Sequence, residues 1–82
     1  MIKIYVVFFA GARDIVGQSR LEIEIPALTT VAELRELLMV RFPKLENLAR
    51  RAAFAVNEIF VLTDTLLVEN DEVAFLPAVS GG

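Results

Sequence analysis

Few groups in this chain could do chemistry, and the first candidate is the pair of glycines Gly81 and Gly82. Because glycine has no Cβ, a Gly-Gly end is thin and can enter a narrow channel with its carboxylate leading. Such an end could present the Gly82 carboxylate to the active site of another protein. The alternative is an ordinary frayed terminus, since exposed glycines at a chain end are easily tolerated.

The side chains that usually catalyse reactions near neutral pH are missing, because the chain contains no histidine and no cysteine. This argues against a self-contained enzyme, which would need a general base or a reactive nucleophile. It also excludes disulfides and zinc-finger-type sites. We interpret the adjacent acids Asp71 and Glu72 as solvated turn residues, and we expect no metal site and no bound cofactor.

The charge balance also limits the choice of partners. Eight basic residues against eleven acidic ones give a net charge of −3, so we expect no binding to nucleic acid, which favours basic surfaces. The longest apolar run, residues 4–12, is shorter than the roughly 18 residues that cross a bilayer. The first residues show no signal-peptide pattern. We therefore expect a cytoplasmic protein with no membrane partner.

The 82 residues are enough for one small domain. Runs of β-branched residues and period-two alternation predict strands over residues 2–9, 21–25, 53–56, 59–61 and 72–76. The capping-box pair Thr30 and Glu33 begins an amphipathic helix over residues 31–42, which Pro43 ends. Residues 10–17 are predicted to form a loop, and residues 44–51 fit a helical turn and a loop equally well.

These elements follow the order ββαββ, which predicts an α+β fold. A hairpin, a helix that crosses over and later strands favour a mixed sheet with one main helix packed on one face. The first and last strands would lie parallel at its centre, as in the β-grasp, or ubiquitin-like, architecture. We expect a β-grasp domain over residues 1–77 and a flexible C-terminal Gly-Gly tail over residues 78–82, with Pro77 ending the last strand.

The sheet face without the helix is predicted to be apolar. If Ile4, Val6 and Phe8 face the core, the outward residues of the two central strands are apolar as well. That outward set is Val7, Phe9, Ala74 and Leu76, which Phe60 could join. Uncovered patches of this kind mark partner surfaces on small proteins. The alternative is that residues 44–61 fold over this face and bury it.

Four stretches of the sequence are recognisable: residues 8–17, 30–35, 55–57 and 70–82. Through them the chain resembles the small subunit of molybdopterin synthase, the sulfur-carrier branch of the ubiquitin-like proteins. The last stretch is the most specific. The familiar tail of that family is Pro-Pro-Val-Thr-Gly-Gly, whereas this chain has Pro77-Ala78-Val79-Ser80-Gly81-Gly82, with alanine in place of the second proline.

The resemblance implies a function for the Gly82 carboxylate. An E1-like adenylating enzyme would adenylate it with ATP, a sulfur donor would convert it to a thiocarboxylate, and its sulfur would pass to the pterin precursor to form the dithiolene of molybdopterin. The active site would lie on a large subunit, in a two-plus-two heterotetramer, and this chain would be its sulfur-donating subunit. The partner-binding residues implied in this way are Phe9, Phe60, Leu76, Val79, Ser80, Gly81 and Gly82.

Two alternatives stay open. The chain could be a ubiquitin-like carrier or modifier for another pathway, such as thiamine synthesis, tRNA thiolation or protein conjugation. It could also be a plain β-grasp binding module whose tail is incidental.

Overall fold

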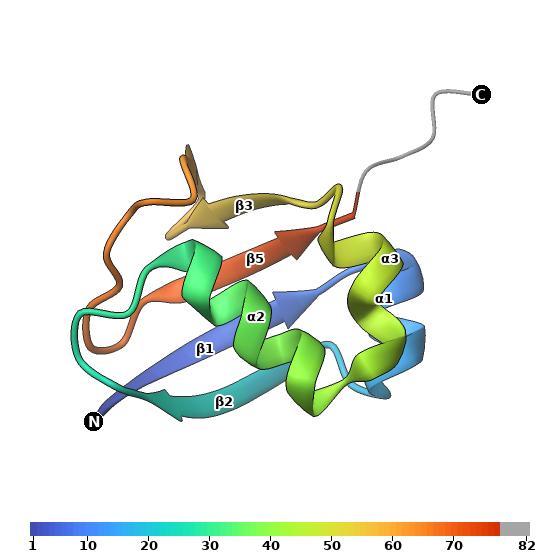
Figure 1. Ribbon diagram of the computed structural model, residues 1–82, viewed down its shortest axis with the longest axis horizontal. Helices are drawn as coiled ribbons and strands as arrows, with labels where there is room; N and C mark the ends of the chain where they lie inside the picture. The colour runs from blue at the N-terminus through green and yellow to red at the C-terminus, as the bar shows by residue number, and fades with distance from the viewer. Residues whose placement is uncertain (78–82) are drawn as a thin grey trace.

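The computed structural model describes residues 1–77, which form one five-stranded sheet with helices over one face (Figure 1). The elements are β1 (Ile2–Phe8), α1 (Ala10–Val16), β2 (Arg20–Ile25), α2 (Val31–Arg41), η1 (Pro43–Leu45), α3 (Glu46–Ala49), β3 (Ala53–Val56), β4 (Ile59–Val61) and β5 (Glu72–Leu76). Helix α2 crosses the sheet, whereas α1 and α3 lie at the end where β1 and β5 finish (Figure 1). No helix within residues 1–77 is long and apolar enough to span a membrane.

The strand order is β2-β1-β5-β3-β4, and β1 and β5 run parallel in its interior. The β1–β2 and β3–β4 pairs are antiparallel hairpins, and β3 is antiparallel to β5. The predicted mixed sheet is therefore confirmed, with strand and helix limits that differ from the prediction by one residue at most. The edge strand β4 is the strand predicted over residues 59–61, and the structure adds the small helices α1, η1 and α3 to the predicted elements.

The core lies between the sheet and α2. In β1 every second side chain is buried, namely Ile4, Val6 and Phe8, and this row meets the buried face of α2. Helix α2 contributes Val31, Leu34 and Leu38. Each of these side chains contributes about 1.5–3 kcal/mol when it is removed from water, so the period-two and helical patterns of the sequence account for the main packing.

The N-terminus of α2 is held from two directions. The Thr30 hydroxyl accepts from the Glu33 amide at 3.2 Å, while the Glu33 carboxylate accepts from the Thr30 amide at 2.9 Å, which completes the predicted capping box. The next amides of the helix are satisfied by the chain after β4. The Thr63 carbonyl accepts from Ala32 at 2.8 Å and the Thr65 carbonyl accepts from Val31 at 3.0 Å.

The predicted loop over residues 10–17 is wrong, because residues 10–16 form helix α1. The Phe9 carbonyl accepts from the Ala12 and Arg13 amides, and Gly17 ends the helix in the left-handed region with φ of 87°. Gly17 donates its amide to the Arg13 carbonyl at 2.8 Å, as a glycine C-cap does. Residues 44–51, which the sequence left open, are largely helical in η1 and α3, with Leu45 buried.

Asp71 is also not the solvated turn residue that was predicted. It is only 7% exposed, and its carboxylate accepts from the Asn57 side-chain amide at 2.9 Å and from the Val68 amide at 2.8 Å. The Asn57 side-chain oxygen accepts in turn from the Glu72 amide at 3.0 Å. Both Asn57 and Glu58 have positive φ, as a tight two-residue hairpin turn requires. Asp71 thus fixes the β3–β4 turn to the start of β5.

Candidate functional site

The C-terminal segment begins at a firmly anchored point. Phe75 is fully buried, with its ring 5.4 Å from that of Phe54 and 5.9 Å from that of Phe8. Strand β5 ends one residue later, at Leu76, and Pro77 follows without an amide hydrogen to continue the ladder. The four predicted site residues Val79, Ser80, Gly81 and Gly82 lie outside the described residues.

A row of apolar residues crosses the sheet face that carries no helix. Val7, Ala74, Ala55 and Phe60 are paired in register across β1, β5, β3 and β4. They alternate with core residues such as Phe8, Phe54 and Phe75, so they point away from the helices. Phe60 is the most prominent member, with 73% of its surface exposed.

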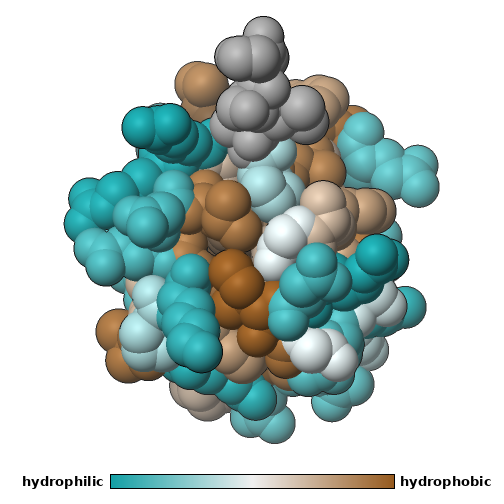
Figure 2. Space-filling model, turned by 90° about the vertical axis from the view of Figure 1, so that its right-hand side faces the viewer, coloured by the Kyte–Doolittle hydropathy of each residue, from teal (hydrophilic) through white to brown (hydrophobic). Residues whose placement is uncertain are grey.

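Phe9 and Leu76 lie at the end of the sheet from which the C-terminal segment leaves. Phe8, the last residue of β1, pairs with Phe75 of the parallel strand β5. Phe9 follows Phe8 in the chain, and Leu76 follows Phe75. Phe9 is 45% exposed, and its backbone is fixed by the α1 hydrogen bonds to its carbonyl. Figure 2 shows this end of the molecule, where hydrophobic side chains gather near the middle of the face and hydrophilic ones lie around them.

The predicted site residues that lie within residues 1–77 are thus all accessible on the outer side of the sheet. We name the set Val7, Phe9, Ala55, Phe60, Ala74 and Leu76 the outer patch, in which Ala55 lies beneath its neighbours with only 5% of its surface exposed. Residues 44–61 extend the sheet through β3 and β4 or pack with the helices through η1 and α3, so within the described chain they do not cover this face.

The other half of this sheet face is polar. The Arg20 guanidinium lies 4.3 Å from the centre of the Tyr5 ring and 3.8 Å from the Glu72 carboxylate. Tyr5, and after it the carboxylate of Glu22, raise the pKa of the Lys3 ammonium above its ordinary value. An apolar half and a charged half on one face suit a protein interface, in which the apolar part supplies affinity and the charges set orientation.

Sequence reasoning missed two exposed apolar residues beside this patch. Ile59 begins β4, and Leu62, which is 77% exposed, follows its last residue. The signal was available, because Ile59-Phe60-Val61-Leu62 is an unbroken apolar run where a half-exposed edge strand would alternate. Ile59 alternates with Phe60 and so lies on the helix side of β4, whereas Leu62 adds to the apolar surface at the β4 edge of the sheet.

Comparison with known proteins identifies the family. A family model described as the ThiS family matches residues 6–82. The chain belongs to the ThiS family. The match includes both the apolar strands of the outer patch and the glycines Gly81 and Gly82.

Relatives of this ThiS-family chain carry a consistent description. It is 36% identical over 83 residues to the molybdopterin synthase sulfur carrier subunit of Mycobacterium tuberculosis, with 100% of both chains covered. Among solved structures, the putative molybdopterin converting factor subunit 1 of Pyrococcus furiosus gives a TM-score of 0.86 at 29% identity, covering 96% of this chain and 100% of the other. The resemblance noted in the sequence is therefore confirmed, and so is the β-grasp fold.

A third neighbour is a protein–protein complex of subunits 1 and 2 of the molybdopterin-converting factor from Helicobacter pylori. Its matching chain gives a TM-score of 0.70 at 23% identity, covering 99% of this chain and 100% of the other. At that identity the likeness shows the fold alone.

Proposed function

We propose that this chain is the sulfur-carrier subunit of a molybdopterin synthase and that the Gly82 carboxylate carries the sulfur. The observation that carries the proposal is the full-length similarity, at 36% identity, to a molybdopterin synthase sulfur carrier subunit. The β-grasp base and the Gly81-Gly82 pair support it, because together they offer a firm platform and an unbranched acyl end.

The chemistry needs activation, since a free carboxylate is too stabilised to accept a nucleophile. A carboxylate oxygen of Gly82 attacks the α-phosphorus of ATP on an E1-like adenylating enzyme, and pyrophosphate leaves. A sulfur nucleophile from the donor then attacks the carbonyl carbon, and AMP leaves. Where the nucleophile is the outer sulfur of a donor persulfide, a second thiol attacks the donor's own sulfur in the resulting acyl disulfide, so the donor leaves as a disulfide and the chain ends in a thiocarboxylate. The thiocarboxylate sulfur then attacks the pterin precursor on the large subunit, and water hydrolyses the acyl–sulfur bond, which leaves the sulfur on the pterin and restores the Gly82 carboxylate.

This division of work suits a chain without histidine or cysteine. The adenylating enzyme and the large subunit supply the acid–base groups, while this chain supplies the acyl–sulfur end and the surface that positions it. The outer patch is the docking surface in this proposal, with Phe9 and Leu76 next to the segment that enters the partner. The complex is a heterotetramer with two copies of each subunit, and the carrier works in the cytoplasm.

The decisive experiment is an intact-mass measurement after incubation of the chain with ATP, an adenylating enzyme from the same source and a sulfur donor. The expected result is a mass increase that corresponds to replacement of one oxygen by sulfur, and its absence in a variant that lacks Gly82. No shift, with an adenylating enzyme shown to be active on another carrier, would contradict the proposal and favour a binding module.

The acceptor needs its own test. The thiocarboxylated chain is mixed with the large subunit and the pterin precursor, and formation of molybdopterin is measured. Product formation supports a molybdopterin synthase. A carrier that is thiocarboxylated but gives no product, and instead becomes joined to lysines of other proteins through an isopeptide bond, would be a modifier.

A further inference from the structure

A hollow opens at the β4 edge of the sheet because two segments that begin as a hairpin separate. Strands β3 and β4 pair from Val56 and Ile59 to Phe54 and Val61, and the pairing stops there. Two pairs further on, Thr63 would face Ala52. Its carbonyl accepts instead from the Ala32 amide at the start of α2, which draws the chain away from β3.

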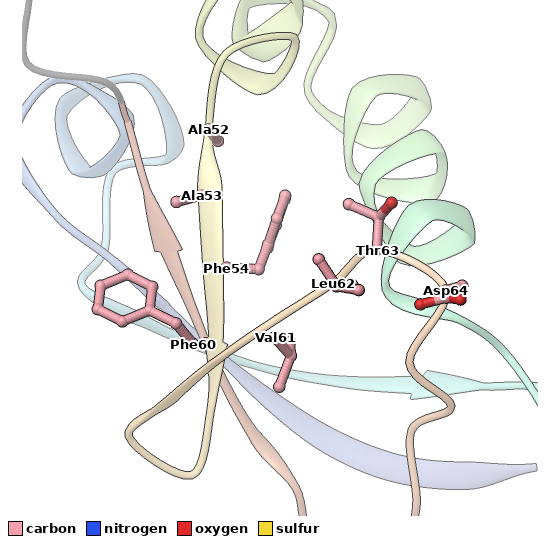
Figure 3. A pocket seen from close by; sticks show the side chains of 8 residues that line it. All are labelled: Ala52, Ala53, Phe54, Phe60, Val61, Leu62, Thr63 and Asp64. Atoms are coloured by element: carbon pink, nitrogen blue, oxygen red, sulfur yellow. The ribbon is translucent and has the colours of Figure 1, made fainter.

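The space left between the two segments has a volume of about 520 Å³ (Figure 3). We name it the edge hollow, and it is lined by Ala52, Ala53, Phe54, Phe60, Val61, Leu62, Thr63 and Asp64. Figure 3 shows Phe54 on one side of the hairpin and Phe60 on the other, with Leu62, Thr63 and Asp64 along the diverging chain.

The lining is mostly apolar with one charge at its rim. Leu62 forms one wall of the hollow, and its side chain is largely exposed to water. The buried side chain of Phe54 forms the floor. Asp64 is exposed and makes no ion pair with any residue of the described chain. An apolar hollow with a single unpaired carboxylate fits a large apolar side chain that has a lysine or arginine close to it.

The hollow also adjoins the surface described above. Phe60 belongs both to its lining and to the outer patch. Ala53 lines it as well and pairs with Leu76, the last residue of β5. A protein that covers the outer patch and receives the C-terminal segment therefore reaches this hollow without leaving the interface.

We infer that the edge hollow is an anchoring site for the large subunit, which inserts a large apolar side chain there and places a basic side chain against Asp64. This inference rests on the proposed function, because it takes the large subunit as the occupant. The continuity of the hollow with the outer patch and the uncompensated charge of Asp64 favour this occupant over a small molecule.

The test uses three variants of the full chain and measures the dissociation constant of the complex with the large subunit. Ala52→Phe fills the hollow, Leu62→Ser removes its apolar wall, and Asp64→Lys reverses its charge. We expect Ala52→Phe to weaken binding by about tenfold or more, as loss of a central apolar anchor does. Leu62→Ser and Asp64→Lys should each weaken it by about three- to tenfold, the latter mostly at low salt.

Matched controls separate this site from general surface effects. Val40→Ser removes an exposed apolar side chain from α2, and Glu58→Lys makes the same change of charge at the β3–β4 turn. Both should bind like the parent chain. Thermal unfolding of each variant shows whether the fold is kept, and Leu62→Ser and Asp64→Lys, at exposed positions, keep the test valid if Ala52→Phe unfolds.

A photo-crosslinking residue at position 62 provides an independent reading. We expect it to crosslink to the large subunit, whereas the same residue at position 40 should not.

The outcomes separate the inference from the proposed function. Binding by the parent chain with no effect of the three variants and no crosslink would overturn the inference and leave the proposed function intact. Failure of the parent chain to bind at all would contradict the proposed function itself. A chain that dimerises through this edge, and loses the dimer in Ala52→Phe, would show that a second copy is the occupant.

Discussion

The ring of Phe75 lies edge-on to the ring of Phe54, with the ring centres 5.4 Å apart and the planes at 88°. Edge-to-face pairs of this kind add about 0.5–1.5 kcal/mol to the burial of the rings themselves. Phe75 is the last fully buried residue of β5, so this contact holds the strand just before Leu76 and Pro77. The residue immediately before Leu76 and Pro77 is therefore part of the core.

Truncation of this anchor should lower the stability of the whole domain. We expect Phe75→Ala to reduce the free energy of unfolding by about 3–5 kcal/mol, because a buried aromatic side chain is replaced by a cavity. Urea unfolding followed by circular dichroism measures the change. The exposed Phe60→Ala is the matched control and should change stability by no more than about 0.5 kcal/mol. Equal losses in the two variants would contradict the anchoring role.

Asp71 should act on stability and not on sulfur transfer. In Asp71→Ala the Asn57 side-chain amide and the Val68 amide lose their acceptor, so we expect a loss of about 1–3 kcal/mol per group left unsatisfied. Asp14→Ala removes an exposed carboxylate and should be close to neutral. Thiocarboxylate formation, measured well below the unfolding temperature, should be the same in both variants. A selective loss of it in Asp71→Ala would show a role beyond the turn.

The main elements could be predicted because local patterns determine them. Alternation in β1 places Ile4, Val6 and Phe8 in the core, and the pair Thr30 and Glu33 marks the start of α2. The same alternation places Phe60 on the outer face. Each of these features depends on spacing within one element, which is visible in the sequence.

The features that were missed depend on distant contacts. Asp71 is buried because Asn57, fourteen residues earlier, binds its carboxylate. The edge hollow exists because the Thr63 carbonyl is drawn to the start of α2. Helix α1 is short and has no side-chain cap, so its main local signal is Gly17 at the C-terminal end. Neither the burial of Asp71 nor the edge hollow could be predicted from the periodicity of a single segment.

The capping box gives a prediction of modest size. Thr30→Ala should lower the free energy of unfolding by about 1 kcal/mol, because the Glu33 amide loses its acceptor. Thr63→Ala is a suitable control, since Thr63 supports α2 through its backbone carbonyl, which alanine retains. Thermal unfolding of the two variants compares them directly. A larger loss in Thr63→Ala would mean that its side chain contributes more than the contacts of the helix start suggest.

The outer patch should govern binding with little effect on folding. We expect Phe9→Ser and Phe60→Ser each to weaken the complex with the large subunit by about tenfold or more, as truncation of aromatic anchors does. Serine at position 9 is a good N-cap for α1, so stability should be preserved there. Val40→Ser, which replaces an exposed apolar side chain of α2 with serine, is the control. Calorimetric titration measures all three, and unchanged affinity in both patch variants would remove this face from the interface.

The end of the chain should tolerate no addition if Gly82 carries the sulfur. One alanine appended after Gly82 moves the carboxylate by a residue and places a Cβ on the acyl group that must enter the adenylating site, so we expect no thiocarboxylate by intact mass. The core contacts of Phe75 are untouched, so the unfolding temperature should match that of the parent chain. Binding to the large subunit through the outer patch should also persist. An extended chain that still acquired sulfur would show that the acyl group is elsewhere, and one that lost binding and sulfur together would show that the tail contributes most of the affinity.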